Sequence, residues 1–321
     1  MEKFLLIYLN WFQQLPQNKM TLPNKLQFKT PAKINLGLHI HKKREDGFHE
    51  LETLFQMVAW FDEMEMEGAP EKVELFCDAP GIPNDESNLV IKAARLLQNN
   101  FPGKCGGVKI KLKKNIPSGA GLGGGSGNAA GALLALNILW NLKLPRSELI
   151  ALASDLGSDV PFFLMSPCAI GKGKGEILQP IESPISFYIL MIYPGFPIST
   201  SWVYGNLKLK LTKTKNNISI SKNFLMRSEF AQLGATLQND LEPVVIKRYP
   251  EILEIKNELL NLGAEGTLLS GSGSTVFGIF ENPEIAKKAL ARFTGKKYRV
   301  CLAKSITRFS EFFPEEMISA F

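Results

Sequence analysis

The sequence predicts an α+β protein built from two domains. Its 321 residues can enclose a sizeable core, and 45% of them are apolar and 21% charged, as in ordinary globular proteins. Strand-like and helix-like segments interleave in both halves without a βα repeat of fixed period. We expect residues 26–180 to form an N-terminal domain and residues 181–321 a C-terminal domain. Residues 1–25 stand apart as an N-terminal extension, because their apolar run "FLLIYLNWF" is short and no signal-peptide cleavage site follows it.

Each element of the expected N-terminal domain follows from its local pattern. Partly alternating apolar residues predict strands over residues 26–41, 52–67 and 72–77, with a break or sheet edge at Pro31. Residues 87–100 have apolar positions at helical spacing behind a possible N-cap, Ser87, and predict a helix. Residues 107–117 predict a strand that leads into a glycine-rich loop. The apolar residues 128–142 predict a helix that leaves the loop, and a further helix is expected from residue 146 to near Gly157.

The second half has its own succession of elements. Residues 185–195 predict a buried strand, and a basic, polar stretch follows around residues 208–222. Helices are expected over residues 229–241, 251–262 and 283–293. Between the last two, "GTLLSGSGSTVFGIF" (266–280) predicts two strands joined by a second glycine turn.

Composition argues against several classes of protein. The net charge is +6, but the basic residues are mostly dispersed and no nucleic-acid-binding motif accompanies them. No run approaches the roughly 20 apolar residues of a membrane span. The four cysteines lie far apart, which argues against a disulfide framework or a zinc site. We therefore expect a cytoplasmic protein with no nucleic-acid or membrane partner; whether it is a monomer or a homodimer does not follow from the sequence.

The most informative stretch, "PSGAGLGGGSG", places a glycine-rich loop directly before an apolar helix. Glycine is costly to order, so a cluster indicates that something approaches the backbone closely, and a tight turn alone would need fewer glycines. Free N–H groups at a helix N-terminus attract anions, and phosphate oxygens reach them where no Cβ intervenes. The loop is therefore predicted to bind the phosphates of a cofactor through Pro117, Ser118, Gly119, Ala120, Gly121, Leu122, Gly123, Gly124, Gly125, Ser126 and Gly127.

Two familiar phosphate loops fit poorly. The chain has no GxxxxGK[ST] string, so it lacks a Walker A loop. A GxGxxG pattern occurs at Gly119, Gly121 and Gly124, but the acidic residue expected about 20 positions later is missing from residues 136–146. An NAD-binding dehydrogenase therefore remains a distant alternative, as does a basic nucleic-acid module.

Six stretches together resemble the GHMP kinase superfamily, which includes galactokinase, homoserine kinase and mevalonate kinase. They are "PAKINLGLHIHKKREDGFHELETLFQ", "SNLVIKAARLL", "IPSGAGLGGGSGNAA", "LGSDVPFFL", "GKGEILQPI" and "LLSGSGSTVFGIF", and they run from Pro31 to Phe280 in the superfamily's order. The combination of PAKINL, DGFHELETLF and SDVPFF is more specific than a glycine loop. The resemblance implies the two-domain GHMP kinase fold, with an N-terminal ATP-binding α/β sandwich, a C-terminal α+β domain and an active site in the cleft between them.

Within the superfamily, the motifs are most similar to those of the members that act on a cytidine diphosphate substrate. The resemblance implies transfer of phosphate from ATP, with Mg²⁺, to the 2-hydroxyl of 4-diphosphocytidyl-2-C-methyl-D-erythritol, in the non-mevalonate route to isopentenyl diphosphate. Another small-molecule GHMP kinase is the close alternative. The stretch "GFHELETLF" favours the cytidine substrate, because a cytosine clamp has no role in recognising galactose or mevalonate.

Two charged residues lie in apolar surroundings, Lys33 in a strand segment and Asp159 before "VPFFL". From the residues alone they could form a structural ion pair or take part in catalysis. The resemblance favours catalysis: it implies that Asp159 is the general base and that Lys33 holds its carboxylate ionised. It also implies that Ser126 helps to place Mg²⁺, although the superfamily's usual second serine is replaced by Gly127 here.

The resemblance also implies a set of substrate contacts. The ring of Phe48, where relatives usually have Tyr, would stack on cytosine, and His49 would hydrogen-bond the base edge. Asn35 would contact the substrate near the reacting hydroxyl. Thr200 and Tyr204 match further cytidine contacts more loosely.

Further positions are expected in supporting roles. Asn88 and Lys114 match residues that line the ATP site in the superfamily. The turn at residues 270–275 is expected to close on the substrate diphosphate or to brace the first glycine loop. His39 and His41 would share one face of a strand, but without a third ligand nearby they are interpreted as ordinary strand histidines and not as a metal site.

Overall fold

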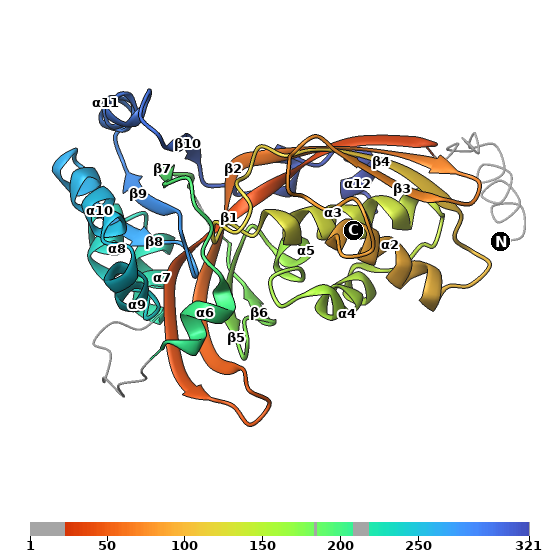
Figure 1. The fold of residues 1–321 in the computed structure, drawn as a ribbon, viewed down its shortest axis with the longest axis horizontal. Helices are drawn as coiled ribbons and strands as arrows, with labels where there is room; N and C mark the ends of the chain where they lie inside the picture. Colours follow the sequence, from red (N-terminus) through yellow and green to blue (C-terminus); the bar gives the residue numbers. More distant parts are fainter. Residues whose placement is uncertain (1–22, 183–184, 208–217, 321) are drawn as a thin grey trace, which may run out of the picture.

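The computed structural model describes residues 23–182, 185–207 and 218–320 (Figure 1). The fold of this part is α+β, as predicted, with one sheet in each half of the molecule. Nearly all of the expected extension, residues 1–25, lies outside the described residues. No helix of the described part combines the length and the apolar character that crossing a membrane requires.

The first sheet has six strands in its described part, ordered β3–β4–β2–β5–β6, with β1 paired to β2 beside this path. The strands are β1 (Lys25–Lys43), β2 (His49–Ala69), β3 (Val73–Cys77), β4 (Gly107–Lys113), β5 (Cys168–Lys172) and β6 (Ile177–Pro180). The pair β3–β4 is parallel and the other pairs are antiparallel. β5 and β6 were not predicted.

β1 and β2 form one long hairpin that runs through both halves of the molecule (Figure 1). Of the two alternatives expected at Pro31, the break is wrong, because β1 continues through it with a shift of register between Pro31 and Ala32. The sheet edge agrees with the structure, because among the described strands β1 pairs only with β2. A bulge accommodates a proline without ending a strand. A second shift, between Asn35 and Gly37, lies just beyond Lys33. Irregular pairing thus occurs on both sides of Lys33.

Helices cover one face of the first sheet: α2 (Leu89–Asn100), α3 (Gly124–Leu139), α4 (Arg146–Leu156), α5 (Phe162–Met165) and, from the C-terminal end, α12 (Glu315–Ile318). α3 is buried along almost its whole length, which explains its uniformly apolar sequence. The N-cap of α2 is Asn88, whose Oδ1 accepts from Val90 N at 2.9 Å, and not the predicted Ser87. The Ser87 hydroxyl instead donates to Asp85 Oδ1 at 2.6 Å.

The second sheet is antiparallel, in the order β10–β7–β9–β8. It consists of β7 (Tyr188–Tyr193), β8 (Gly266–Leu269), β9 (Val276–Phe280) and β10 (Arg299–Lys304). Around it lie α6 (Thr200–Gly205), α7 (Ile218–Met226), α8 (Phe230–Thr236), α9 (Glu242–Arg248), α10 (Glu251–Asn261) and α11 (Pro283–Phe293).

One expectation for this half is wrong, and several elements were not predicted. The helix expected over residues 229–241 ends at Thr236, because the Asn239 amide donates to Leu269 O and Gly271 O and holds the chain in a loop. α7, which begins inside the stretch described as basic and polar, was not predicted, and neither were α9 and β10. Each depends on packing that the local pattern does not show.

The middle of β1 contributes to two apolar cores. Phe28 belongs to the core beneath the first sheet, whereas Ala32 and Ile34 belong to a core shared with the second sheet. After β10 the chain returns to the first core, where Ile306 and Met317 are buried. The domain boundary at residue 180 stays a prediction.

Candidate active site

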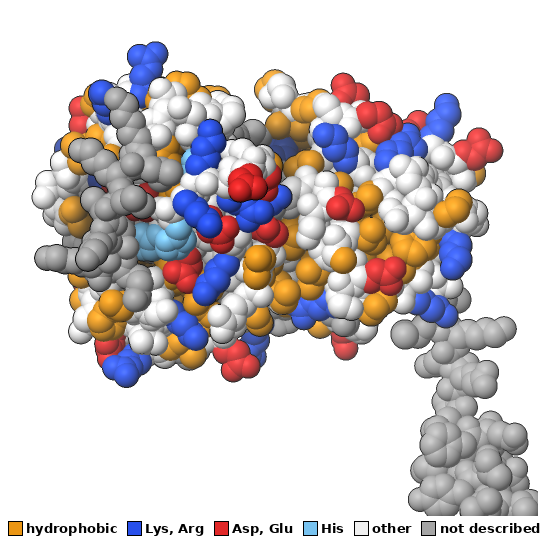
Figure 2. All heavy atoms as spheres, turned by 90° about the horizontal axis from the view of Figure 1, so that it is seen from below, with side chains coloured by type: hydrophobic (Ala, Val, Ile, Leu, Met, Phe, Trp, Pro, Cys, Tyr) orange, Lys and Arg blue, Asp and Glu red, His pale blue; other side chains and the backbone are white. Residues whose placement is uncertain are grey.

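A cleft of about 980 Å³ is lined by both halves of the chain. Its walls come from β1, the β1–β2 turn, the loop before α3, the segment after α4, α6 and the turn between β8 and β9. Figure 2 views the molecule from the side of the β1–β2 turn, where histidine side chains lie beside a group of basic and acidic ones. The volume is at the upper end of the range for small-molecule sites.

The structure brings nearly all of the predicted site residues to this cleft. Those lining it are Lys33, Asn35, Phe48, His49, Asn88, Lys114, Pro117, Ser118, Gly119, Ala120, Gly121, Leu122, Gly123, Gly124, Gly125, Ser126, Asp159, Thr200 and Tyr204. Gly127 lies outside the lining: a Cβ there would meet Pro31 O at 2.9 Å and the Phe163 ring at 3.3 Å. Gly127, which replaces the superfamily's usual second serine, thus lies where α3 packs directly against β1, with no room for a side chain.

The glycine-rich loop takes a backbone path that side chains disfavour. Gly119, Gly121 and Gly123 have φ values of +65°, +77° and +67°, in the left-handed region that glycine alone enters freely. Gly123 is the N-cap of α3, and no side chain of the described residues caps this helix end. The first N–H groups of α3 therefore point toward the cleft without a capping oxygen, which suits an anion.

The second glycine turn braces the first. The Ser270 hydroxyl donates to Gly121 O at 2.9 Å, and Thr275 N donates to Ala120 O at 3.1 Å. The contact is so close that a Cβ on Gly121 would lie 2.0 Å from Ser270 O. Of the two roles expected for residues 270–275, bracing is the one to which these hydrogen bonds correspond.

Lys33 and Asp159 meet at the centre of the cleft. The Lys33 ammonium lies 3.3 Å from Asp159 Oδ2 and donates to Asn35 Oδ1 at 2.8 Å. It also lies 5.2 Å from the centroid of the Phe55 ring. Only 6% of the Lys33 side chain is exposed, against 31% of the Asp159 side chain. The carboxylate is thus the member of the pair that a substrate can reach.

Thr53, which was not predicted, holds Asn35 beside Lys33. Asn35 Nδ2 donates to the Thr53 hydroxyl at 2.8 Å, and that hydroxyl donates to Gly37 O at 2.7 Å. This chain of hydrogen bonds turns the Asn35 oxygen toward Lys33. Thr53 carries no signal in the sequence, because its position depends on the register of β2 against β1.

Phe48 lies at the mouth of the cleft with 56% of the residue exposed. The ammonium of Lys174 is 4.6 Å from the centroid of its ring. Lys174, which also was not predicted, lines the same cleft from the turn between β5 and β6. An exposed ring at the edge of a polar cleft is available to stack on a planar ligand.

His49 and Tyr204 face each other, with ring centroids 5.1 Å apart and planes inclined by 34°. Burial lowers the pKa of His49, and the nearby Lys43 cation lowers it further. Burial also raises the pKa of Tyr204, with a contribution from the negative charge of Asp159. Both side chains are therefore neutral near pH 7 and can exchange directional hydrogen bonds with a ligand.

Three predicted residues already have partners within the protein. The Asn88 amide caps α2 and donates to Pro83 O at 2.8 Å. The Lys114 ammonium forms an ion pair with Asp62. The Thr200 hydroxyl shares a hydrogen bond of 2.8 Å with Ser272. These side chains line the cleft in fixed orientations.

The strand histidines do not form a metal centre. His39 is buried with its Nδ1 3.7 Å from Asp240 Oδ1, and His41 is exposed. Among the described residues, no group of three or more His, Cys, Asp or Glu side chains could hold a metal ion.

Comparisons with known proteins agree with the geometry. Residues 88–167 match the model of the GHMP kinases N terminal domain, and residues 224–300 match that of the GHMP kinases C terminal domain. The chain is 42% identical to a 4-diphosphocytidyl-2-C-methyl-D-erythritol kinase of Chlorobium phaeobacteroides (strain BS1), over 87% of this chain and 97% of the relative. It is 45% identical to the kinase of that name from Syntrophus aciditrophicus (strain SB), over 82% of this chain and 93% of the relative.

Solved structures lead to the same family. A crystal structure of 4-(cytidine 5'-diphospho)-2C-methyl-D-erythritol kinase superposes with a TM-score of 0.74 at 35% identity, over 87% of this chain and 99% of that one. The mevalonate kinase of L. major shares the fold, with a TM-score of 0.71 at 16% identity over 89% and 98% of the two chains. The chain therefore belongs to the 4-diphosphocytidyl-2-C-methyl-D-erythritol kinases, a family of GHMP kinases.

Proposed function

We propose that the protein transfers the γ-phosphoryl group of ATP to the 2-hydroxyl of 4-diphosphocytidyl-2-C-methyl-D-erythritol. The observation that carries this proposal is the Lys33–Asp159 pair, 3.3 Å apart, in the same cleft as an uncapped glycine-loop helix. Relatives at 42% and 45% identity bear the name of this activity. The product would be the 2-phosphate and ADP, within the non-mevalonate route to isopentenyl diphosphate.

ATP binds with its phosphates at the glycine loop in this proposal. The backbone N–H groups of the first turn of α3 face the anion, and the helix dipole adds partial positive charge at the same end. Glycines at positions 123 to 125 leave the approach free of side chains. Phosphoryl transfer depends mostly on positioning and charge stabilisation, which a rigid cradle of this kind supplies.

Asp159 accepts the proton of the attacking hydroxyl. Its partly exposed carboxylate lies at the cleft, and the buried ammonium of Lys33 lies 3.3 Å from its Oδ2. Asn35 positions that ammonium from the other side. The atoms balance: the hydroxyl oxygen bonds to the γ-phosphorus, the bond to the bridging oxygen of ADP breaks, and the proton passes to Asp159.

Mg²⁺ fits this site as an ion held mainly by the nucleotide. Magnesium usually takes one or two protein oxygens and completes its shell with phosphate and water. The described residues offer no three-carboxylate cluster, and Ser126, in the first turn of α3, supplies one hydroxyl. When bound, the ion would neutralise charge on the β- and γ-phosphates.

The cytidine end of the substrate is assigned to the β1–β2 turn. Phe48 offers an exposed ring for stacking, and neutral His49 offers a directional hydrogen bond to the base edge. Thr200 and Tyr204 line the same region from α6. Another GHMP kinase reaction would leave this aromatic edge without a role.

A transfer assay tests the proposal. Purified protein is given ATP, Mg²⁺ and, in parallel, the cytidine substrate, homoserine, mevalonate and galactose, and ADP formation is measured. Turnover with the cytidine substrate alone is expected. Preferred turnover with another acceptor would replace the substrate assignment, and NADH binding without ATP turnover would favour a dehydrogenase.

The proposed setting is the cytoplasm, with a monomer or a homodimer as the active species. All four cysteines are free thiols, which suits a reducing compartment. Light scattering of the active sample decides between monomer and dimer.

A further inference from the structure

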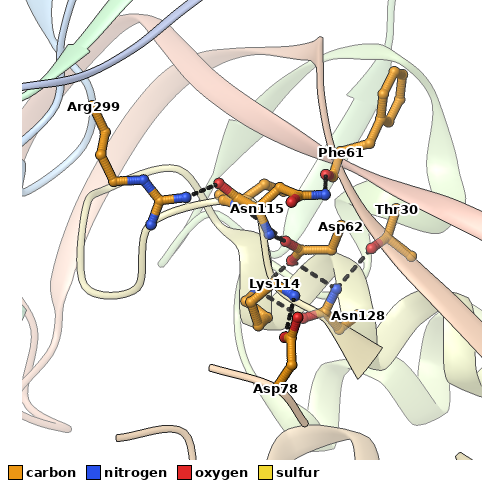
Figure 3. A network of polar contacts seen from close by, with 9 residues as sticks. Thr30, Phe61, Asp62, Asp78, Lys114, Asn115, Asn128 and Arg299 are labelled. Atoms are coloured by element: carbon orange, nitrogen blue, oxygen red, sulfur yellow. Dashed lines mark hydrogen bonds and ion pairs between the residues drawn. The ribbon is translucent and has the colours of Figure 1, made fainter. Parts of the chain in front are cut away.

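A fully buried carboxylate beneath the glycine loop takes no part in the mechanism above. Asp62, in β2, has no exposed surface. Its Oδ1 accepts from Asn115 N at 2.7 Å and from Ile116 N at 2.8 Å, and its Oδ2 accepts from Asn128 Nδ2 at 3.0 Å (Figure 3). Oδ2 also forms the ion pair with Lys114. Four donors around one carboxylate compensate for the loss of its water.

This carboxylate joins the elements that frame the nucleotide end of the cleft. Asn115 and Ile116 lead from β4 into the glycine loop, and Asn128 belongs to α3, which leaves the loop. Asn128 Nδ2 also donates to the Thr30 hydroxyl of β1 at 2.7 Å. Asp62 therefore fixes both ends of the glycine loop against the sheet.

The position of Lys114 needs an explanation. Its ammonium lies beside the first residue of α3, since a Cβ on Gly124 would be 3.2 Å from Lys114 Nζ. A cation is repelled at a helix N-terminus. A lysine side chain is also flexible and well hydrated, so an unpaired ammonium would turn toward water. Asp62 and Asn128 Oδ1, at 2.9 Å, hold it in place.

These two acceptors leave one hydrogen of the ammonium unused. An ammonium group carries three N–H donors. Within the described residues, Lys114 Nζ has only Asp62 Oδ2 and Asn128 Oδ1 as hydrogen-bond acceptors. Just 6% of the side chain is exposed, and the residue lines the cleft. The third N–H of Lys114 is therefore held in a fixed position at the cleft and is not free to turn toward water.

We propose that Asp62 is a positioning residue for nucleotide binding, which acts by fixing the Lys114 ammonium so that its third N–H meets an acceptor of ATP. The acceptor is a base nitrogen or a phosphate oxygen of the nucleotide. This role rests on the proposed binding of ATP at the glycine loop. It also explains why a carboxylate, which by itself would repel phosphate, lies beneath a phosphate-binding loop. The ion pair with Lys114 neutralises its negative charge.

A double-mutant cycle tests this role. Asp62→Asn keeps the side chain's shape and removes the charge, and Lys114→Met removes the ammonium. Each single change is expected to raise KM for ATP about tenfold while kcat and KM for the cytidine substrate stay within about threefold. In the Lys114→Met background, Asp62→Asn should leave KM for ATP within about twofold or lower it, because it then removes an unpaired carboxylate that would repel phosphate. Full additivity of the two effects would overturn the proposal.

Binding of a non-hydrolysable ATP analogue, titrated without acceptor substrate, gives the same cycle independently of the transfer reaction. If the wild type binds the analogue but transfers nothing to the cytidine substrate, the substrate assignment fails. The role of Asp62 is then decided by the affinities for the analogue alone. If Asp62→Asn does not fold, Asn128→Ser takes its place, because it removes the second acceptor of the ammonium. An unchanged affinity for the analogue in Asn128→Ser would then overturn the proposal.

Glu242→Gln is the matched control for the loss of a buried charge. Glu242 is 13% exposed, forms an ion pair with Lys256 and accepts from Leu269 N at 2.9 Å. Like Asp62, it pairs with a lysine and accepts from a backbone N–H, but it is slightly more exposed and does not line the cleft. Its substitution should lower the melting temperature and leave the affinity for the ATP analogue within about twofold. A loss of affinity like that of Asp62→Asn would show that general destabilisation explains both.

Discussion

Replacing Gly121 by alanine should separate the two glycine turns that frame the cleft. Gly121 has φ +77°, and a Cβ there would lie 2.0 Å from Ser270 O and 3.0 Å from Gly273 N. The left-handed conformation costs a residue with a Cβ about 1–2 kcal/mol. Displacing a packed backbone carbonyl adds about 1–3 kcal/mol. We therefore expect Gly121→Ala to lower the free energy of unfolding by about 2–5 kcal/mol, the sum of these two ranges.

Gly125→Ala is the control within the same loop. Gly125 is the second residue of α3, its φ is not positive, and the nearest atom to an added Cβ is Leu89 Cδ1 at 3.8 Å. The folded state has room for the methyl group, so the free energy of unfolding should stay equal or rise by up to about 1 kcal/mol. If phosphates approach α3 here, the same methyl group should nevertheless raise KM for ATP.

Urea unfolding gives both free energies by linear extrapolation, and steady-state kinetics gives KM for ATP. The two variants should separate the two reasons for glycine: a clash within the fold at position 121, and an approach by the ligand at position 125. A loss below about 1 kcal/mol for Gly121→Ala, under the range expected for overpacking, would refute the close contact of the turns. Equal losses in both variants would refute the distinction.

Three further predictions concern the reaction. Asp159→Asn should lower kcat by about 10²–10⁴ with little change in melting temperature; a variant that keeps more than about a tenth of the activity would contradict its role as base. Phe48→Ala should raise KM for the cytidine substrate by about 5- to 150-fold and spare KM for ATP, and the reverse pattern would place the base elsewhere. Because burial lowers the pKa of His49 below 6.5, the side chain is neutral at pH 7. KM for the cytidine substrate should therefore stay flat from pH 7 to 8 and rise only when acid protonates His49. If the His49→Gln variant shows the same rise of KM at acid pH, the rise comes from the protonation of another group.

Local chemistry could be predicted from the sequence because it depends on neighbours along the chain. The glycine loop and the helix behind it follow from residues 117–142 alone, as does the turn at 270–275. The motifs also pointed to Lys33 and Asp159 as partners, although the two residues lie far apart in the chain. The structure brings the two together at 3.3 Å.

Local pattern also failed in recognisable places. Ser87 and Asn88 are both good N-caps, and only the backbone geometry shows that Asn88 is used. The strand passes through Pro31 because a bulge accommodates it, and a bulge depends on the partner strand. α8 stops at Thr236 because Asn239 bonds to a turn some 30 residues away in the chain.

The sequence by itself predicted the glycine loop as a phosphate site, because residue type and spacing carry that chemistry. Lys33 and Asp159 were predicted as the reacting groups only through the resemblance to the GHMP kinases, and their roles stay predictions. Tertiary structure alone decided how those groups are held. Thr53 orients Asn35, Ser270 braces Gly121, and Asp62 fixes Lys114, and each contact joins segments far apart in sequence. Such contacts depend on strand register and on the packing of one loop against another. A register shift of one residue would turn Thr53 to the other face of the sheet, and no local pattern records that choice.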